Sequence, residues 1–274
     1  MAKQIVFIHG MFMTPRCWER WVGFFEAAGY ECLAPAWPLH EGEPSELRAR
    51  VPAGLGDLTF AGVLGEMERV ISKLEEPPIL VGHSVGGLVV QVLVNRGLAA
   101  AGVCISPVAP NAMLSLDWNF LKSTVAILNP MMGDAPQEMT PELFHETFAN
   151  CLTEEESRRE WEWYAVHESR NVLRTALGKE GHVELTKFHV PLLFLSGRED
   201  HIVPEALVER NFDAYGMAVG TKSIRLFAGR DHHICNEPGW REVAGYVESW
   251  LSQHGAGSPT LLEVEEHIAE EAMI

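Results

Sequence analysis

Six short apolar runs recur along the chain, and longer segments with helical patterning separate them. Each run is rich in Val, Ile, Leu or Phe and bounded by Gly or Pro, which is typical of a strand buried on both faces. The runs are Ile5–Ile8, Glu31–Ala34, Ile79–Val81, Gly102–Ile105, Leu192–Leu195 and Ser223–Phe227. The helical segments are Thr14–Ala28, Phe60–Leu74, Val85–Arg96, Glu205–Tyr215 and Gly239–Leu251. This alternation predicts an α/β fold, with a mainly parallel sheet covered by helices on both faces.

One stretch interrupts the alternation. Between about residues 111 and 187 there is no clear strand, and the segment is helical and rich in aromatic residues. An insertion at this point would lie over the carboxyl ends of the strands, where open α/β sheets bind ligands. The pattern therefore predicts a helical cap over residues 111–187 and a core formed by residues 1–110 and 188–254. A simple addition to the core is the alternative for most apolar positions of the insertion.

The charge balance and the cysteines narrow the range of partners. The 274 residues include 21 Lys and Arg against 38 Asp and Glu, a net charge of −17, which opposes binding to nucleic acid or to an anionic membrane. An acidic tail over residues 255–274 contributes to this excess, and it either forms a short amphipathic helix or frays. Five scattered cysteines, no signal peptide and no run near the roughly 18 apolar residues of a membrane span favour a cytoplasmic location.

The clearest chemical motif is Gly82-His83-Ser84-Val85-Gly86-Gly87, which follows an expected strand and precedes an expected helix. A serine between glycines at such a turn is typical of a nucleophile elbow, because side chains at Gly82 and Gly86 would collide with neighbouring backbone. The turn exposes the hydroxyl and directs a helix N-terminus at it, which favours developing negative charge. The alternative is a tight glycine turn whose serine only caps the helix.

The chain resembles α/β-hydrolase-fold proteins of the bacterial esterase, lactonase and cofactor-free haloperoxidase-like type. The resemblance runs from Lys3 to about Leu251 and rests on four motifs in the same order: Phe7-Ile8-His9-Gly10, the Ser84 motif, Gly197-Arg198-Glu199-Asp200-His201-Ile202-Val203-Pro204 and Gly229-Arg230-Asp231-His232. It implies the α/β-hydrolase fold without its N-terminal hairpin, because the His-Gly strand begins within the first five residues. A sheet of about six strands is therefore expected.

The resemblance also implies a catalytic triad in the order serine, acid, histidine. A serine hydroxyl is a weak nucleophile until a base takes its proton, and the base needs an orienting carboxylate. Asp200 matches the family's acid position, and its neighbour Glu199 is expected to point to solvent. His232 matches the base, although His233 follows it directly and this doubled histidine departs from the family pattern.

The resemblance further implies an oxyanion hole formed by two main-chain groups, the N–H of Met11 after His9-Gly10 and the N–H of Val85 after the nucleophile. An apolar pocket is expected beside it. Its candidate lining residues, which are also candidates for the core of the cap, are Phe12, Trp118, Met131, Met132 and Phe148.

Together these residues predict a serine hydrolase that cleaves a small or medium, largely apolar ester or lactone, with no metal or cofactor. The same scaffold hosts C–C bond hydrolases, perhydrolases and cofactor-free dioxygenases, and a small-molecule receptor that keeps the triad is the non-enzyme alternative. Dehalogenases are disfavoured because they need a carboxylate nucleophile at the position of Ser84. A metal site at His232 and His233 is disfavoured because adjacent histidines point in different directions. A dinucleotide site lacks the second glycine of its motif.

Overall fold

The computed structural model of the protein describes residues 3–113, 128–216 and 220–254. Six strands form one parallel sheet with the order β2-β1-β3-β4-β5-β6. The strands are β1 (Gln4–Ile8), β2 (Glu31–Leu33), β3 (Ile79–His83), β4 (Ala101–Ile105), β5 (Leu192–Gly197) and β6 (Lys222–Phe227). Each predicted strand is present within two residues of its expected bounds, so the predicted mainly parallel sheet of about six strands is confirmed.

The strand order places a topological switch point between β1 and β3. The chain passes from β1 outward to β2, and then returns to the other side of β1 to form β3. Open parallel sheets bind ligands outside the carboxyl ends of their strands at such a point. The loop after Ile8 and the turn after His83 therefore occupy the position where a ligand site is expected.

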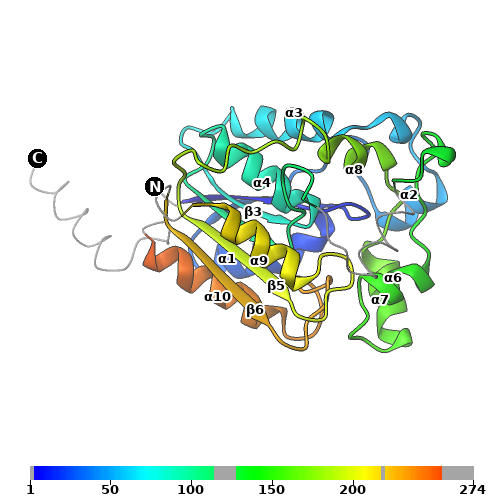
Figure 1. Cartoon of the computed structure of the whole chain (residues 1–274). Helices are drawn as coiled ribbons and strands as arrows, with labels where there is room; N and C mark the ends of the chain where they lie inside the picture. The colour runs from blue at the N-terminus through cyan, green and yellow to red at the C-terminus, as the bar shows by residue number, and fades with distance from the viewer. Residues whose placement is uncertain (1–2, 114–127, 217–219, 255–274) are drawn as a thin grey trace, which may run out of the picture.

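Helices cover both faces of the sheet (Figure 1). On one face lie α3 (Phe60–Ile71) and α4 (Val85–Asn95), which pack on each other, and on the other face α1 (Glu19–Ala27) packs on α10 (Trp240–Gln253). Helix α9 (Glu205–Ala214) packs on β5 and β6. The central strands β3, β4 and β5 are buried along their whole length, which explains why their sequences are nearly continuous apolar runs.

Two features depart from the predicted helices. The expected helix Thr14–Ala28 begins as a 3-10 turn, η1 (Pro15–Trp18), because the Thr14 hydroxyl accepts the Arg16 N–H and the Thr14 carbonyl accepts the Cys17 N–H. A short helix that was not predicted, α2 (Pro44–Ala49), follows β2, and another 3-10 turn, η2 (Leu55–Asp57), follows it.

Within the described ranges, no helix is both long and apolar enough to cross a bilayer.

The described part of the insertion between β4 and β5 is helical. It contains η3 (Pro130–Met132), α6 (Pro141–Thr147), α7 (Glu154–Tyr164) and α8 (Arg170–Ala176). Helices α6 and α7 lie together at one end of the sheet, beside α2, whereas α8 packs on α3 (Figure 1). The division into core, cap and tail stays a prediction, and the expected tail 255–274 lies outside the described residues.

Hydrogen bonds join this helical segment to the loops at the carboxyl ends of the strands. The Val166 N–H donates to the Phe12 carbonyl after β1, and the His233 N–H after β6 donates to the Phe148 carbonyl, both at 2.9 Å. Arg48 of α2 donates to the Trp161, Glu162 and Ala165 carbonyls at the end of α7, where a cation can bind the carbonyls of the last helical turn.

Candidate active site

Ser84 lies at the turn between β3 and α4 in a backbone conformation that non-glycine residues rarely adopt, with φ of 57° and ψ of −120°. Packing around the turn requires its glycines. A Cβ on Gly82 would lie 2.2 Å from the Gly86 carbonyl oxygen, and a Cβ on Gly86 would lie 2.3 Å from the Ile8 carbonyl oxygen. The Ser84 side chain makes no capping hydrogen bond to α4. The strained turn therefore presents a serine that the helix does not use.

Asp200 and His232 meet across the ends of β5 and β6. The Asp200 Oδ2 atom lies 2.7 Å from His232 Nδ1, and Asp200 Oδ1 accepts the N–H groups of Ile202 and Val203 at 2.8 Å. Because the carboxylate accepts from all of these donors, the proton of this pair lies on Nδ1. Neutral His232 therefore has its lone pair on Nε2, a buried nitrogen with no partner among the described residues.

His83 brings the Ser84 turn against His232. The two imidazole rings have centroids 4.6 Å apart, and His83 Nε2 donates to the His232 carbonyl at 2.8 Å. Burial lowers the pKa of His83, so this side chain is neutral. No hydrogen bond joins Ser84 Oγ to His232 Nε2 in the described part of the structure. Such bonds are often long in a ligand-free site and shorten when substrate binds.

The two adjacent histidines have different partners. His233 Nε2 lies 3.0 Å from the Glu160 carboxylate on α7, and the His233 N–H donates to Asp231 as well as to Phe148. The structure thus pairs His232, rather than His233, with Asp200. Glu199 contacts neither ring, since its exposed carboxylate accepts the N–H groups of Gly229 and Arg230.

The expected oxyanion donors lie on loops that meet at Ser84. A Cβ on Gly10 would lie 2.9 Å from the Ser84 Cβ, so the loop after β1 approaches the serine as closely as a glycine allows. The Met11 N–H has no acceptor among the described residues. Val85 is the first residue of α4, and its N–H has no acceptor within the helix. Both main-chain groups can therefore donate to an oxyanion.

His9 holds the peptide that contains the Met11 N–H. His9 Nε2 accepts the Trp37 N–H at 3.1 Å, which places the ring proton on Nδ1, and Nδ1 donates to the Gly10 carbonyl at 2.9 Å. Burial lowers the pKa of His9, in agreement with a neutral ring. Because a peptide is planar, fixing the Gly10 oxygen also fixes the direction of the Met11 N–H.

The expected pocket residues divide into two groups. Phe148 stands edge-on to His232 with centroids 5.0 Å apart, and Phe12 stands edge-on to Phe148 at 6.2 Å, so both lie at the site. Met131 is 92% exposed and Met132 is 49% exposed. The structure does not bring these two methionines into a buried pocket, because η3 presents them to solvent. Trp118 lies outside the described residues.

Several buried charged groups near the site were not among the predicted site residues. Glu168 accepts hydrogen bonds from the Phe12 N–H and from His40, and both side chains are almost fully buried. Asp231 accepts the Cys151 and His233 N–H groups, and burial raises its pKa. Burial and the neighbouring Asp231 carboxylate also raise the pKa of Glu237 to about 8. Nothing in the sequence around Glu237 indicated that its carboxyl group would be buried beside another carboxylate.

The described residues contain no group of three or more His, Cys, Asp or Glu side chains placed to hold a metal ion. The arrangement can instead transfer a proton between an imidazole and a hydroxyl and stabilise an oxyanion with main-chain donors.

Comparison with solved structures returned proteins of the same fold. A monoacylglycerol lipase from Paleococcus ferrophilus has a TM-score of 0.68 and 20% identity, covering 93% of this chain and 97% of that chain. Polyneuridine aldehyde esterase has a TM-score of 0.64 and 18% identity, covering 90% and 98% of the two chains. Methylesterase MES16 from Arabidopsis has a TM-score of 0.65 and 14% identity, covering 92% and 99%.

At these identities the similarity shows the fold alone. A search of curated proteins found no match. The model of the alpha/beta hydrolase family, in contrast, matches residues 5–245, which is most of the chain. The sheet order, the serine turn after β3 and this match agree, and the chain belongs to the alpha/beta hydrolase family.

Proposed function

We propose that the protein is a serine hydrolase that cleaves a small or medium, largely apolar carboxylic ester or lactone through an acyl-enzyme at Ser84. The observation that carries this proposal is the buried Asp200–His232 pair, whose Nε2 is left open beside the strained serine turn. The proposal includes a cytoplasmic location, since all five cysteines are free thiols.

In the proposed reaction, His232 Nε2 takes the proton of the Ser84 hydroxyl as its oxygen attacks the substrate carbonyl carbon. The carbonyl oxygen becomes an oxyanion that accepts hydrogen bonds from the Met11 and Val85 N–H groups. Asp200 stabilises the imidazolium that forms. When the tetrahedral intermediate collapses, the bond to the leaving alcohol breaks and His232 returns the proton to that oxygen.

Deacylation repeats these steps with water. His232 removes a proton from the water as it attacks the acyl carbon, and the Ser84 oxygen leaves and regains a proton from His232. A lactone would open by the same route into a hydroxy acid.

The surroundings of the proposed base favour an apolar substrate. Phe148 and Phe12 lie at the site, and Phe144 stacks on Phe148 with centroids 5.4 Å apart. In this proposal residues 111–187 form a cap whose aromatic side chains exclude water from the acyl group. The similar solved structures include a lipase and two esterases by their own descriptions, which agrees with an ester substrate without demonstrating one.

A fluorophosphonate probe combined with a panel of p-nitrophenyl esters and lactones tests the proposal. We expect the probe to label Ser84 and the protein to turn over at least one ester or lactone continuously. Ser84→Ala should lose both properties. The control is Ser157→Ala, which removes a buried serine of α7 whose hydroxyl has no hydrogen-bond partner among the described residues. This variant should keep both labelling and turnover.

Two outcomes would overturn the proposal. Labelling that survives in Ser84→Ala would show that another residue is the nucleophile. Tight substrate binding with a single slow turnover would identify a receptor that retains the triad rather than an enzyme.

A further inference from the structure

Glu168 is a fully buried carboxylate in the segment between α7 and α8, and its oxygens accept hydrogen bonds from three groups. Oε1 accepts the Ser169 N–H at 2.7 Å, and Oε2 accepts the Phe12 N–H at 3.3 Å. Oε2 also contacts His40 Nε2 at 3.1 Å. A carboxyl group that only accepts hydrogen bonds is ionised.

His40 completes a buried ion pair with this carboxylate. Its Nδ1 lies 3.0 Å from the Pro38 carbonyl oxygen, which can only accept a hydrogen bond, and its Nε2 faces ionised Glu168. Both ring nitrogens must therefore carry protons, so the ring is an imidazolium. Burial lowers the pKa of His40, but the charge and hydrogen bond of Glu168 outweigh burial, and the net effect is a raised pKa.

This ion pair holds the loop that contains the proposed oxyanion donor. His9 fixes the peptide before Met11 through the Gly10 carbonyl, and Glu168 fixes the peptide after it through the Phe12 N–H. The Phe12 carbonyl accepts the Val166 N–H, and Phe12 itself has a φ of 64°, which is unfavourable for a non-glycine residue. Contacts on both sides of Met11 therefore maintain a strained backbone that would otherwise relax.

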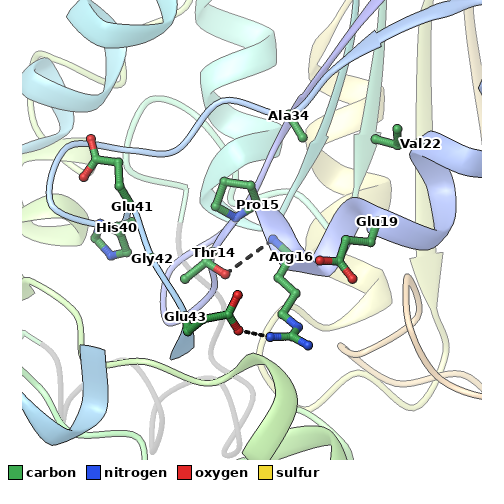
Figure 2. Close-up of a pocket in the computed structure, with 10 residues that line it drawn as sticks. All are labelled: Thr14, Pro15, Arg16, Glu19, Val22, Ala34, His40, Glu41, Gly42 and Glu43. Carbon is green, nitrogen blue, oxygen red and sulfur yellow. Dashed lines mark hydrogen bonds and ion pairs between the residues drawn. The ribbon is translucent and has the colours of Figure 1, made fainter. Parts of the chain in front are cut away.

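The charge of Glu168 would be harmful at this place without His40. An unpaired buried carboxylate behind Met11 would repel the negative charge that develops on the substrate oxygen. Protonated His40 cancels that charge. His40 is one of ten residues that line a pocket of about 460 Å³ (Figure 2). The titratable or charged groups around His40 are Glu168, His9, Glu41, Glu19 and the paired Arg16 and Glu43.

We propose that Glu168, neutralised by protonated His40, is a positioning residue that holds the Met11 N–H in the orientation needed to bind the oxyanion. The inference rests on the proposed serine hydrolase function. It couples the segment after α7 to the loop after β1, so the insertion takes part in transition-state binding as well as in covering the site.

The proposal predicts a specific dependence of kcat on pH. His40 loses its proton as the pH rises through its raised pKa, and Glu168 is then left as an unpaired negative charge near the oxyanion. We therefore expect kcat of the wild-type protein to decline in that alkaline range. Glu168→Gln removes the carboxylate charge, so this decline should be absent in the variant.

The test measures kcat and KM for a p-nitrophenyl ester with the full-length chain over a range of pH. Loss of an oxyanion donor lowers kcat by roughly 100- to 1000-fold, and a donor that is only misaligned should lose less. Both Glu168 oxygens accept hydrogen bonds, whereas a glutamine side chain has one acceptor oxygen and one N–H2 donor, so it cannot satisfy the Ser169 N–H, the Phe12 N–H and protonated His40 together. For Glu168→Gln we therefore expect kcat to fall by roughly 10- to 100-fold while KM changes less than about threefold.

Thr175→Val is the matched control. The Thr175 hydroxyl of α8 accepts the Phe60 N–H at the start of α3, so it also joins the helical segment to core backbone through a side-chain acceptor. This contact is at the start of α3 and does not involve the loop that contains Met11. Removing the hydroxyl should therefore lower the melting temperature without changing kcat or its pH profile. Should Glu168→Gln fail to fold, Glu168→Gln combined with His40→Gln leaves no unpaired charge and should show the same loss of kcat.

The possible outcomes separate this inference from the proposed function. Turnover independent of Ser84 would refute the proposed function. If turnover requires Ser84 but Glu168→Gln matches Thr175→Val in kcat and pH profile, or if only KM changes, the positioning role of Glu168 is refuted and the function stands.

Discussion

Two buried histidine–carboxylate pairs lie at the carboxyl end of the sheet, and they differ in their second ring nitrogen. In the region after β5 and β6, His232 contacts Asp200 at 2.7 Å and leaves Nε2 without a partner among the described residues. In the region between the β1 loop and α8, His40 contacts Glu168 at 3.1 Å and uses its other nitrogen on the Pro38 carbonyl. Both histidines therefore have a carboxylate partner, but only His232 has a ring nitrogen without one.

This difference determines what each pair can do. A neutral imidazole with one free lone pair can accept a proton from a hydroxyl, whereas an imidazolium with both protons engaged can only hold charge and geometry. The backbone also differs, because Asp200 is held by two N–H groups of its own loop, whereas Glu168 is held by the N–H of the adjacent Ser169 and by that of the distant Phe12. The first pair therefore suits proton transfer, and the second suits the joining of two parts of the chain.

The largest effect should come from Asp200→Asn. The asparagine amide would donate to Nδ1 and move the ring proton to Nε2, so His232 could no longer accept a proton from Ser84. We expect kcat to fall by roughly 10⁴-fold, as for other triads with this change. Glu199→Gln is the control, since its exposed side chain contacts neither histidine and an amide oxygen can still accept the Gly229 N–H. A kcat above about a tenth of the wild-type value in Asp200→Asn would contradict the role of Asp200.

The second effect concerns the stability that the His40–Glu168 pair contributes. Replacing one partner of a buried ion pair leaves an uncompensated charge, so His40→Gln should lower the free energy of unfolding by about 3–5 kcal/mol at pH 6. The folded-state pKa of His40 is raised, so its contribution is complete below the unfolded pKa and is lost as the pH rises through the folded pKa. Urea unfolding at pH 6 and pH 9 should show a smaller difference between wild type and variant at pH 9. A larger difference at pH 9 than at pH 6 would contradict a charged His40.

A third buried acid has no histidine partner and sharpens the comparison. Burial and Asp231 raise the pKa of Glu237 to about 8, and Arg230 at 3.7 Å is its nearest cation. For an acid whose folded-state pKa is raised, stability falls as the pH rises from the ordinary value of about 4.3 to the folded value. Glu237→Gln should therefore unfold like the wild type at pH 4 and be more stable by about 1–3 kcal/mol at pH 9. A variant less stable than wild type at pH 9 would show that ionised Glu237 is well paired.

Local sequence signals were enough for the sheet and for the turn at Ser84. Buried strands are short apolar runs bounded by glycine or proline, and the glycines around Ser84 are required by contacts of 2.2–2.3 Å that no side chain could tolerate. Helix α2 gave no comparable signal, because its six residues are too few to show a helical period and Arg48 ties it to the distant α7. The exposure of Met131 shows the related limit that composition does not say which face of a segment meets solvent.

The His40–Glu168 pair could not be predicted for a different reason. Its members are 128 positions apart and belong to no motif, so only the packing of the segment after α7 on the loop between β2 and α2 brings them together. The doubled histidine lay between these cases. The family motif favoured His232 as the base. The structure distinguishes the two rings by their partners, because His232 contacts Asp200 after β5 and His233 contacts Glu160 on α7.

The smallest effect should come from Glu160→Gln, which removes the carboxylate partner of His233 at 3.0 Å. Its side chain is 20% exposed, so water can replace much of the lost interaction and the free energy of unfolding should fall by less than about 1 kcal/mol. The kcat should stay within about twofold of the wild-type value, because the His233 backbone remains held by Phe148 and Asp231 and the Asp200–His232 contact is untouched. The same ester assay and urea titration measure both quantities. A loss of kcat comparable to that of Asp200→Asn would mean that His233, not His232, is the base. A free second ring nitrogen would then no longer distinguish the catalytic histidine from its neighbour.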